Sequence, residues 1–226
     1  MITNNIENID VNFFIDHAQT GDLILCHEKK WWLSRLIEYF SYSKYSHIGI
    51  ILRGEDINID SKIKKERRDP NDLYFIESSY DRGDDVFTGK REIGVECVGL
   101  TQYLDQYKSG ELGDLYYRKL DMSRDTKFFN IFSTVFYEVR NKPYDLHLWD
   151  WIKAKFDIET GDIQRHDTFW CSALVSYFYV QWGILDKNLP WTIIAPRRFS
   201  HYENQELSFR FSIEPEKIID FRKTQS

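Results

Sequence analysis

Three side chains of the kinds that cooperate in acyl-transfer chemistry lie far apart in the sequence. Cys171 stands near the start of the apolar segment TFWCSALVSYFY, His47 heads the segment HIGIIL, and Glu77 lies near the end of LYFIES. A thiol attacks a carbonyl carbon when a nearby base takes its proton, and a carboxylate can orient that base. Each residue also has an ordinary interpretation, because free cysteine is among the most buried residue types and polar residues are common at strand ends. The elements that position the three residues must decide between these interpretations.

The segment that carries Cys171 is predicted to be a helix. Its apolar residues recur at helical spacing, Asp167 or Thr168 can cap its start, and Gly183 suits its end. Cys171 would then lie in the first turn, where unpaired backbone N–H groups and the helix dipole stabilise a thiolate and can bind an oxyanion. The same apolar stripe would suit any buried helix, so an inert core thiol remains an alternative at this point.

The segments around His47 and Glu77 are predicted to be neighbouring strands. An antiparallel register that matches His47 with Glu77 also matches Gly49 with Phe75 and places these side chains on one face of a sheet. This register is an assumption, because the long polar connection RGEDINIDSKIKKERRDPND joins the two segments and has the length of a lid or a variable insertion. Alternating patterns predict strands over residues 20–26, 47–52, 73–78, 91–100 and 114–120.

Two further helices are predicted, at residues 29–40 and 127–141, and Pro143 is expected to set the end of the second. Strands flanked by helices without a regular strand–helix alternation indicate an α+β fold with a mostly antiparallel sheet. The 226 residues are expected to form one domain, residues 1–226, with a core over about 20–200 and a polar insert over about 54–71.

The charge and the termini exclude some classes of protein. A net charge of -6 and a pI near 5.6 argue against a nucleic-acid partner, and the basic run at residues 62–68 is best explained as a solvated loop. The N-terminal segment lacks the features of a signal peptide, and no apolar run is long enough to span a bilayer. These features predict a soluble protein of the cytoplasm or another reducing compartment.

The three cysteines do not form a disulfide framework or a metal site. Cys26 and Cys97 fall within alternating strand patterns and fit core positions, and the sequence contains no CxxC pair. Neither a metal nor an organic cofactor is expected.

Several motifs in this order resemble one family. They are similar to the circularly permuted papain-like NlpC/P60 proteins, in particular the bacterial YiiX-like hydrolases and their poxvirus relatives. The permuted members carry the histidine before the cysteine helix, as this sequence does. The motifs are GDLIL at 21–25, SHIGIIL at 46–52, FIES at 75–78, NKPYD at 141–145, FWCSALVSYFY at 169–179 and IIAPRRF at 193–199.

The resemblance implies a permuted papain-like fold and assigns a role to each candidate residue. Cys171 would be the nucleophile, His47 the base, and Glu77 the residue that orients the histidine. The sequence departs from the usual family motif Cys-Ser-Glu-Leu-Val, because Ala173 stands in the place of the glutamate.

The expected activity is that of a cysteine hydrolase that cleaves an amide or related acyl bond through a thioester intermediate, with a peptide-like or lipid-linked substrate. One alternative is acyl transfer from a phospholipid, or phospholipase activity, in which Trp31, Tyr42 and Tyr45 would face an acyl chain or make a peripheral contact with a membrane. Another is a catalytically silent binding module. The oligomeric state is left open.

Overall fold

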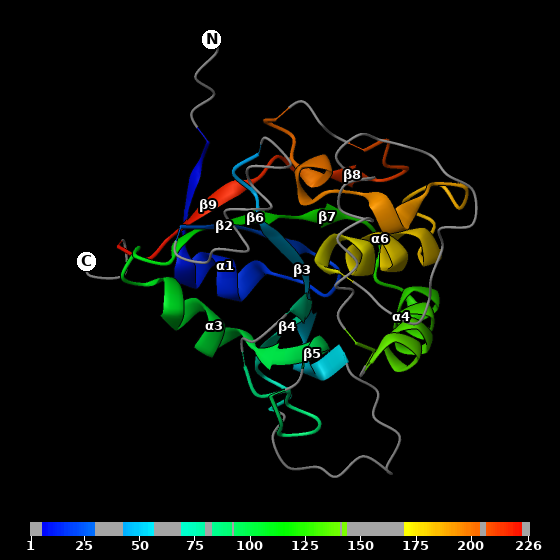
Figure 1. Ribbon diagram of the computed structural model, residues 1–226, viewed down its shortest axis with the longest axis horizontal. Coiled ribbons are helices and arrows are strands. Elements are labelled where there is room, and N and C mark those ends of the chain that lie inside the picture. Colours follow the sequence, from blue (N-terminus) through cyan, green and yellow to red (C-terminus); the bar gives the residue numbers. More distant parts are fainter. Residues whose placement is uncertain are drawn as a thin grey trace.

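The computed structural model describes residues 6–29, 43–56, 69–79, 83–91, 93–140, 142–143, 170–203 and 207–222. Within these ranges the chain forms a seven-stranded sheet in the order β1-β9-β6-β2-β3-β4-β5, and helices lie on both sides of it (Figure 1). Its strands are β1 (Asn8–Asp10), β2 (Leu23–Glu28), β3 (His47–Arg53), β4 (Leu73–Ser79), β5 (Gly94–Gly99), β6 (Gly113–Arg118) and β9 (Lys217–Asp220). Two short strands, β7 (Leu120–Asp121) and β8 (Ser212–Ile213), form a second sheet.

The described helices are α1 (Val11–His17), α3 (Leu100–Tyr107), α4 (Thr126–Val139) and α6 (Cys171–Gln181), with 3-10 turns η1 (Gly54–Asp56), η2 (Trp191–Ile193) and η3 (Pro196–Phe199). In both sheets, every described pair of neighbouring strands is antiparallel except β1 and β9. The prediction of an α+β fold with a mostly antiparallel sheet is therefore confirmed.

The strand predictions hold with small shifts of their ends. The alternation of apolar residues that predicted the strands also divides the core into two clusters, one on each face of the sheet. Leu23, Leu25, Ile48, Ile50 and Ile76 belong to the cluster that includes α4 and α6. The intervening residues, among them Ile24, Cys26, Ile51 and Phe75, belong to the cluster that includes α1 and α3. The sheet is thus covered by helices on both faces.

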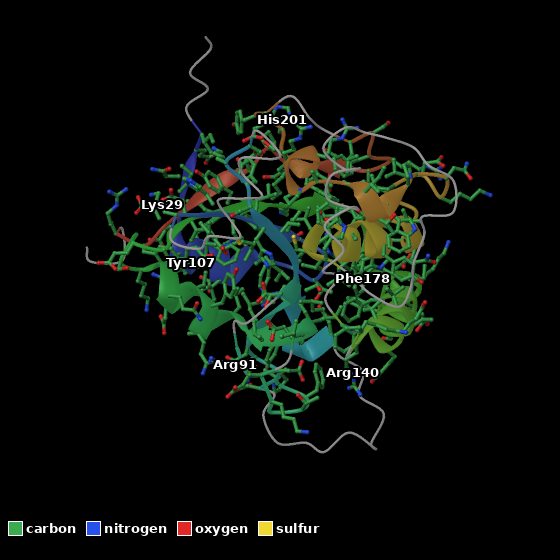
Figure 2. All side chains as sticks on the ribbon, viewed as in Figure 1. Lys29, Arg91, Tyr107, Arg140, Phe178 and His201 are labelled. Carbon is green, nitrogen blue, oxygen red and sulfur yellow. The ribbon has the colours of Figure 1, made fainter. Side chains whose placement is uncertain are left out.

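The helix that carries Cys171 is held by aromatic packing and by its C-terminal turn. Phe178, which is labelled in Figure 2, belongs to α6. Its ring lies 5.8 Å from that of Phe132 of α4, so it joins the two helices. At the end of α6, the N–H groups of Gly183 and Ile184 bond the carbonyls of Val180 and Tyr179, and Gly183 has φ of +73°. This is the Schellman arrangement that a glycine after the last helical residue allows, so the predicted role of Gly183 is confirmed.

Several elements were not predicted from the sequence. α1 begins at an Asp10 cap, whose carboxylate accepts from the N–H groups of Asn12 and Phe13, and α3 follows β5 directly. Strands β1 and β9 pair at one edge of the sheet and lie on either side of the expected core range of 20–200. The predicted helix at 29–40, apart from Lys29, and most of the predicted insert at 54–71 lie outside the described residues.

Candidate functional site

The imidazole of His47 and the carboxylate of Glu77 are joined by a hydrogen bond between Nε2 and Oε2. They do not face each other directly across the strands, as the assumed register required. The observed register of β3 and β4 pairs Ile50 with Ile76 and Ile51 with Phe75, so it differs from the assumed one by two residues. A shift of two residues keeps every side chain on its face of the sheet, because strand side chains alternate with a period of two. The contact therefore survives as a diagonal one.

Glu77 is fully buried on β4, between β3 and the edge strand β5. On the side of β3, the continuing register places it beside Gly49, where an added Cβ would collide with the ring of Phe75. Its Oε2 is bonded to His47, but its Oε1 is buried without a hydrogen-bond partner. An unsatisfied buried acceptor costs about 1–3 kcal/mol, and more for a charged group. A buried carboxylate that is bonded to a histidine, in spite of this free-energy penalty, is typical of a functional site.

His47 is the first residue of β3 and is 5% exposed. Its ring lies 6.3 Å from that of Phe75, and by alternation it shares a face with Ile51 on the side of α1 and α3. Directly opposite His47 on β2 stands Cys26, whose thiol lies 3.3 Å from the hydroxyl of Tyr103. Because Nε2 bonds Glu77, any proton that His47 exchanged with a reacting group would have to pass through Nδ1. A carboxylate bonded to Nε2 would favour the tautomer in which Nδ1 is the base.

Cys171 is the first residue of α6, and its helix begins there without a side-chain cap. The capping residue is Trp170, so the predicted cap at Asp167 or Thr168 is wrong; those two residues lie outside the described ranges. The segment is fixed by two bonds to the loop beyond α6, from Trp170 Nε1 to the carbonyl of Thr192 at 2.6 Å and from Ser172 Oγ to that of Ile194 at 2.5 Å.

The N-terminus of α6 is suited to stabilise negative charge on a sulfur or an oxygen. The first N–H group to bond within the helix is that of Leu174, which donates to Trp170. The N–H groups of Cys171, Ser172 and Ala173 therefore precede the helical hydrogen-bond ladder, and they point with the helix dipole out of its end. Donors of this kind can favour a thiolate or hold an oxyanion.

The structure joins His47 to Glu77 directly and relates Cys171 to them through the packing of its helix. α6 packs against β3 and β4, the strands that carry His47 and Glu77 (Figure 1). Cys171 is 1% exposed and belongs to the core cluster of α4 and α6, whereas the side chains of His47 and Glu77 leave the sheet on the other face. Because the two side chains lie on opposite faces, a meeting of the thiol and the imidazole would have to take place beyond the end of the sheet at which β3 begins.

Two other positions singled out in the sequence are accounted for by burial. Ala173 is 2% exposed and lies in the core, where the carboxylate of the family's usual glutamate would need a partner. Burial raises the pKa of the Cys97 thiol well above its ordinary value, and the neighbouring charge of Asp85 adds to this effect. Cys26 and Cys97 are both buried strand residues, as the alternating patterns predicted.

One residue beside the site was not singled out from the sequence. Glu96 of β5 stands directly opposite Glu77 and is 1% exposed. The segment GVECVG carried the signal, because its alternation places Glu96 on the same face as the apolar Val98. An acidic residue at an inward position of an otherwise apolar strand is uncommon unless it has a partner.

A polar cavity of about 420 Å³ lies at the other end of β3, near Arg53, and is lined also by Thr20, Asp56, Lys119 and Arg124. It does not include the three candidate residues. Among the described residues, no group of three or more histidine, cysteine, aspartate or glutamate side chains is arranged to hold a metal ion. None of the helices in the described ranges is both long and apolar enough to cross a membrane.

The fold and the site define a mixed α/β protein whose large, mainly antiparallel sheet holds a buried histidine–carboxylate pair. No protein-family model and no curated protein sequence matches the chain. Among solved structures, the chain is similar to one described as the metalloprotein YiiX from Escherichia coli O157:H7, with a TM-score of 0.48 and 16% identity over 90% of this chain and 97% of that one. A likeness at this level is too distant to assign an activity.

Proposed function

We propose that the chain is a cysteine hydrolase of the permuted papain-like kind, with Cys171 as nucleophile, His47 as base and Glu77 as the residue that orients His47. The observation that carries the proposal is the buried hydrogen bond between His47 and Glu77. The two strands that supply this pair pack against the one described helix that begins with a cysteine. A peptide-like or lipid-linked acyl group is the proposed substrate.

Two lengths support a meeting of Cys171 and His47. The hydroxyl of Tyr179 bonds the carbonyl of Gly21, and the N–H of Gly21 bonds the carbonyl of Ile51, so α6 and β3 share an anchor. From Tyr179 back to Cys171 the helix spans about 12 Å, at about 1.5 Å per residue. From Ile51 back to His47 the strand spans about 13 Å, at about 3.3 Å per residue. The starts of helix and strand are therefore about equally far from that anchor, so the two residues could meet if α6 and β3 run in the same direction from it.

The proposed reaction has two halves. Nδ1 of His47 takes the proton of the Cys171 thiol, and the thiolate attacks the carbonyl carbon while N–H groups at the start of α6 stabilise the oxyanion. The bond to the leaving group then breaks, and the imidazolium returns the proton to the leaving nitrogen or oxygen. In the second half His47 takes a proton from water, the hydroxide attacks the thioester, and the released thiolate regains its proton as the acid departs.

The experiment that tests the proposal measures hydrolysis of p-nitrophenyl acetate and of a panel of peptide anilides by single variants of the full chain. Cys171→Ala and His47→Ala are expected to abolish turnover, and electrospray mass spectrometry should detect an acyl group on Cys171 in the wild type. Cys26→Ser is the matched control, because Cys26 is the buried thiol directly opposite His47. Loss of turnover in Cys26→Ser with full activity in Cys171→Ala would overturn the assignment of the nucleophile.

The same variants separate hydrolysis from acyl transfer. When phospholipid vesicles and a primary amine are supplied together, a hydrolase releases the free acid, whereas a transferase forms the amide. Mass spectrometry of the products distinguishes these outcomes. If neither the ester nor the phospholipid acylates Cys171, the result would favour the binding module over both enzymes.

A further inference from the structure

Glu77 and Glu96 stand directly opposite each other on neighbouring strands of the sheet, with their side chains on the same face. The two residues are paired across β4 and β5, and both are buried, with Glu77 fully buried and Glu96 1% exposed. Directly opposite residues of an antiparallel pair have Cβ atoms about 4.5–5.5 Å apart on the same face. Glu77 therefore has His47 on one side and Glu96 on the other.

The orientation of Glu96 is fixed by a third side chain. Ser79 donates a hydrogen bond of 2.6 Å from its hydroxyl to Oε1 of Glu96. Ser79 lies on β4 two residues beyond Glu77, so it shares its face of the sheet. The serine thus holds Glu96 on the same side of the sheet as Glu77.

Two carboxylates on directly opposite residues of a buried site do not both ionise readily, because their negative charges repel each other and water does not screen them. A single proton shared by the pair removes this repulsion. The shared proton also supplies a hydrogen-bond donor to Oε1 of Glu77, which is buried without one, while Oε2 is bonded to His47.

We propose that Glu96 carries a proton at neutral pH and donates it in a hydrogen bond to Oε1 of Glu77, which makes Glu96 a positioning residue for His47. The inference rests on the proposed function, in which Glu77 orients the base. Glu77 then remains ionised and faces His47 in one fixed rotamer, with a donor on each of its two oxygens.

The ionisable side chains around the carboxylate pair in the described part of the chain fit this protonation. His47 lies on the neighbouring strand β3, and Cys26 lies on β2 beyond it. Tyr103 of α3 packs on Phe75, and Asp85 accepts a hydrogen bond from the N–H of Cys97 beside Glu96. The acidic Asp85 opposes a second negative charge on Glu96, and a protonated His47 favours the charge on Glu77, to which it is bonded. As the pH rises, Glu96 loses its proton, the two carboxylates repel each other, and the orientation of His47 is lost.

The first test measures protonation and does not depend on catalysis. Infrared spectroscopy of the full chain at neutral pH, with and without ¹³C-labelled glutamate, should show the carbonyl band of a buried protonated carboxylic acid, and this band should disappear in Glu96→Gln. Glu111→Gln, at an exposed glutamate, is the control and should leave the band unchanged. Absence of the band in the wild type would overturn the proposal, as would its persistence in Glu96→Gln.

The second test measures the pH profile of p-nitrophenyl acetate hydrolysis. The rate of the wild type should fall by about tenfold per pH unit above the pKa of Glu96. The amide of Glu96→Gln still donates to Glu77 but cannot lose its proton, so the pH profile of this variant should lack that fall. A purely structural Glu96 would lower the rate equally at every pH, which would contradict a positioning role.

The results distinguish failure of this inference from failure of the proposed function. If Cys171→Ala and His47→Ala abolish turnover but Glu96→Gln has the pH profile of the wild type, the proposed hydrolase activity is supported and the positioning role of Glu96 is contradicted. If Cys171→Ala and His47→Ala leave turnover unchanged, the proposed hydrolase activity is contradicted. The positioning role of Glu96 is then contradicted too, whatever the infrared band shows.

Discussion

At the scale of single residues, the pair of His47 and Glu77 is the feature on which the proposed chemistry depends. Glu77 accepts a hydrogen bond from the imidazole, and both side chains are almost completely buried. A hydrogen bond to an ionised acceptor in such surroundings is shorter and stronger than one between neutral groups. It therefore fixes both the tautomer and the direction of the ring.

Glu77→Gln is expected to reduce turnover by on the order of 10²- to 10⁴-fold while the protein stays folded. The amide has the shape of the carboxylate but can present its N–H₂ group to Nε2, which would place the proton on Nδ1 and remove the base. Steady-state hydrolysis and circular dichroism of the variant check the prediction. Activity within about threefold of the wild type would contradict an orienting role for Glu77.

The residue pair could be predicted from the sequence, but its register could not. The alternation of HIGIIL and LYFIES gives the face of each side chain, and this part of the interpretation was right. The long connection between β3 and β4 does not constrain the alignment of the strands as a tight turn would, so the assumed register was wrong by two residues. Glu96 went unnoticed because its significance depends on the strand beside it, which a single segment does not reveal.

At the scale of elements, the position of Cys171 depends on how both ends of α6 are held. Gly183 has a positive φ, and no atom lies within 4 Å of the place where a Cβ would be added. Gly183→Ala is therefore expected to destabilise the fold by about 1 kcal/mol through backbone strain alone. Gly99→Ala is the matched control, because it has the same open surroundings and an ordinary φ of -64°. Its free energy of unfolding should stay within about 0.5 kcal/mol of the wild type.

Urea denaturation at fixed pH measures both glycine variants. Equal stability of Gly183→Ala and Gly99→Ala would show that the backbone after α6 is not strained by a side chain. The comparison isolates conformation from packing, because neither added methyl group meets a neighbour.

A second prediction for α6 concerns Ala173, which occupies the position of the glutamate in the similar motif Cys-Ser-Glu-Leu-Val. Ala173 is buried within α6, so Ala173→Glu would place a carboxylate in the apolar core. The substitution is expected to lower the free energy of unfolding by about 3 kcal/mol or more. Ala173→Ser, which adds only a hydroxyl that can bond within the helix, should cost much less. A stable and more active Ala173→Glu would mean that a partner for the glutamate exists in this chain.

Elements with a strong internal pattern could be predicted, and those that depend on distant partners could not. α4 buries residues at helical spacing, and α6 is a long apolar segment, buried at every position from Cys171 to Tyr179, that ends at a glycine. α1, in contrast, has only seven residues and begins at an inconspicuous Asp10 cap. β9 has four residues and pairs with β1 and β6, which lie far away in the sequence. Short segments of this kind are stabilised by tertiary contacts more than by their own preferences.

At the scale of the whole molecule, a buried network around Glu216 ties the last part of the chain to the sheet. Its carboxylate accepts from the hydroxyls of Tyr45 and Ser200 and from the N–H of His201. Burial opposes the charge, but the hydrogen bonds from Ser200 and His201 and the charge of Arg118 outweigh it and hold the pKa of Glu216 below its usual value of 4.5. The network therefore stabilises the fold in the ionised state.

A carboxyl group with a lowered pKa contributes stability above its unfolded pKa and loses that contribution as the pH falls through its folded pKa. The wild type should accordingly lose stability below about pH 5 more steeply than Glu216→Gln. At neutral pH the variant should be less stable by about 2–4 kcal/mol, because it leaves the buried Arg118 without its counter-charge. Urea denaturation between about pH 7 and pH 4 checks both statements. Parallel pH curves for the two proteins would contradict this role of Glu216.

The pairing of β1 with β9 has a consequence for the order in which the protein folds. Asn8, Ile9 and Asp10 are aligned with Ile218, Ile219 and Asp220, so the first described strand is completed by the last. On a ribosome, β1 emerges long before β9 and cannot make this pairing until β9 has been synthesised. Contacts between residues so distant in sequence slow folding, because the entropy of closing the long loop must be overcome before the contact is made. The edge of the sheet formed by β1 and β9 is therefore the part of the fold whose completion must wait for the synthesis of β9.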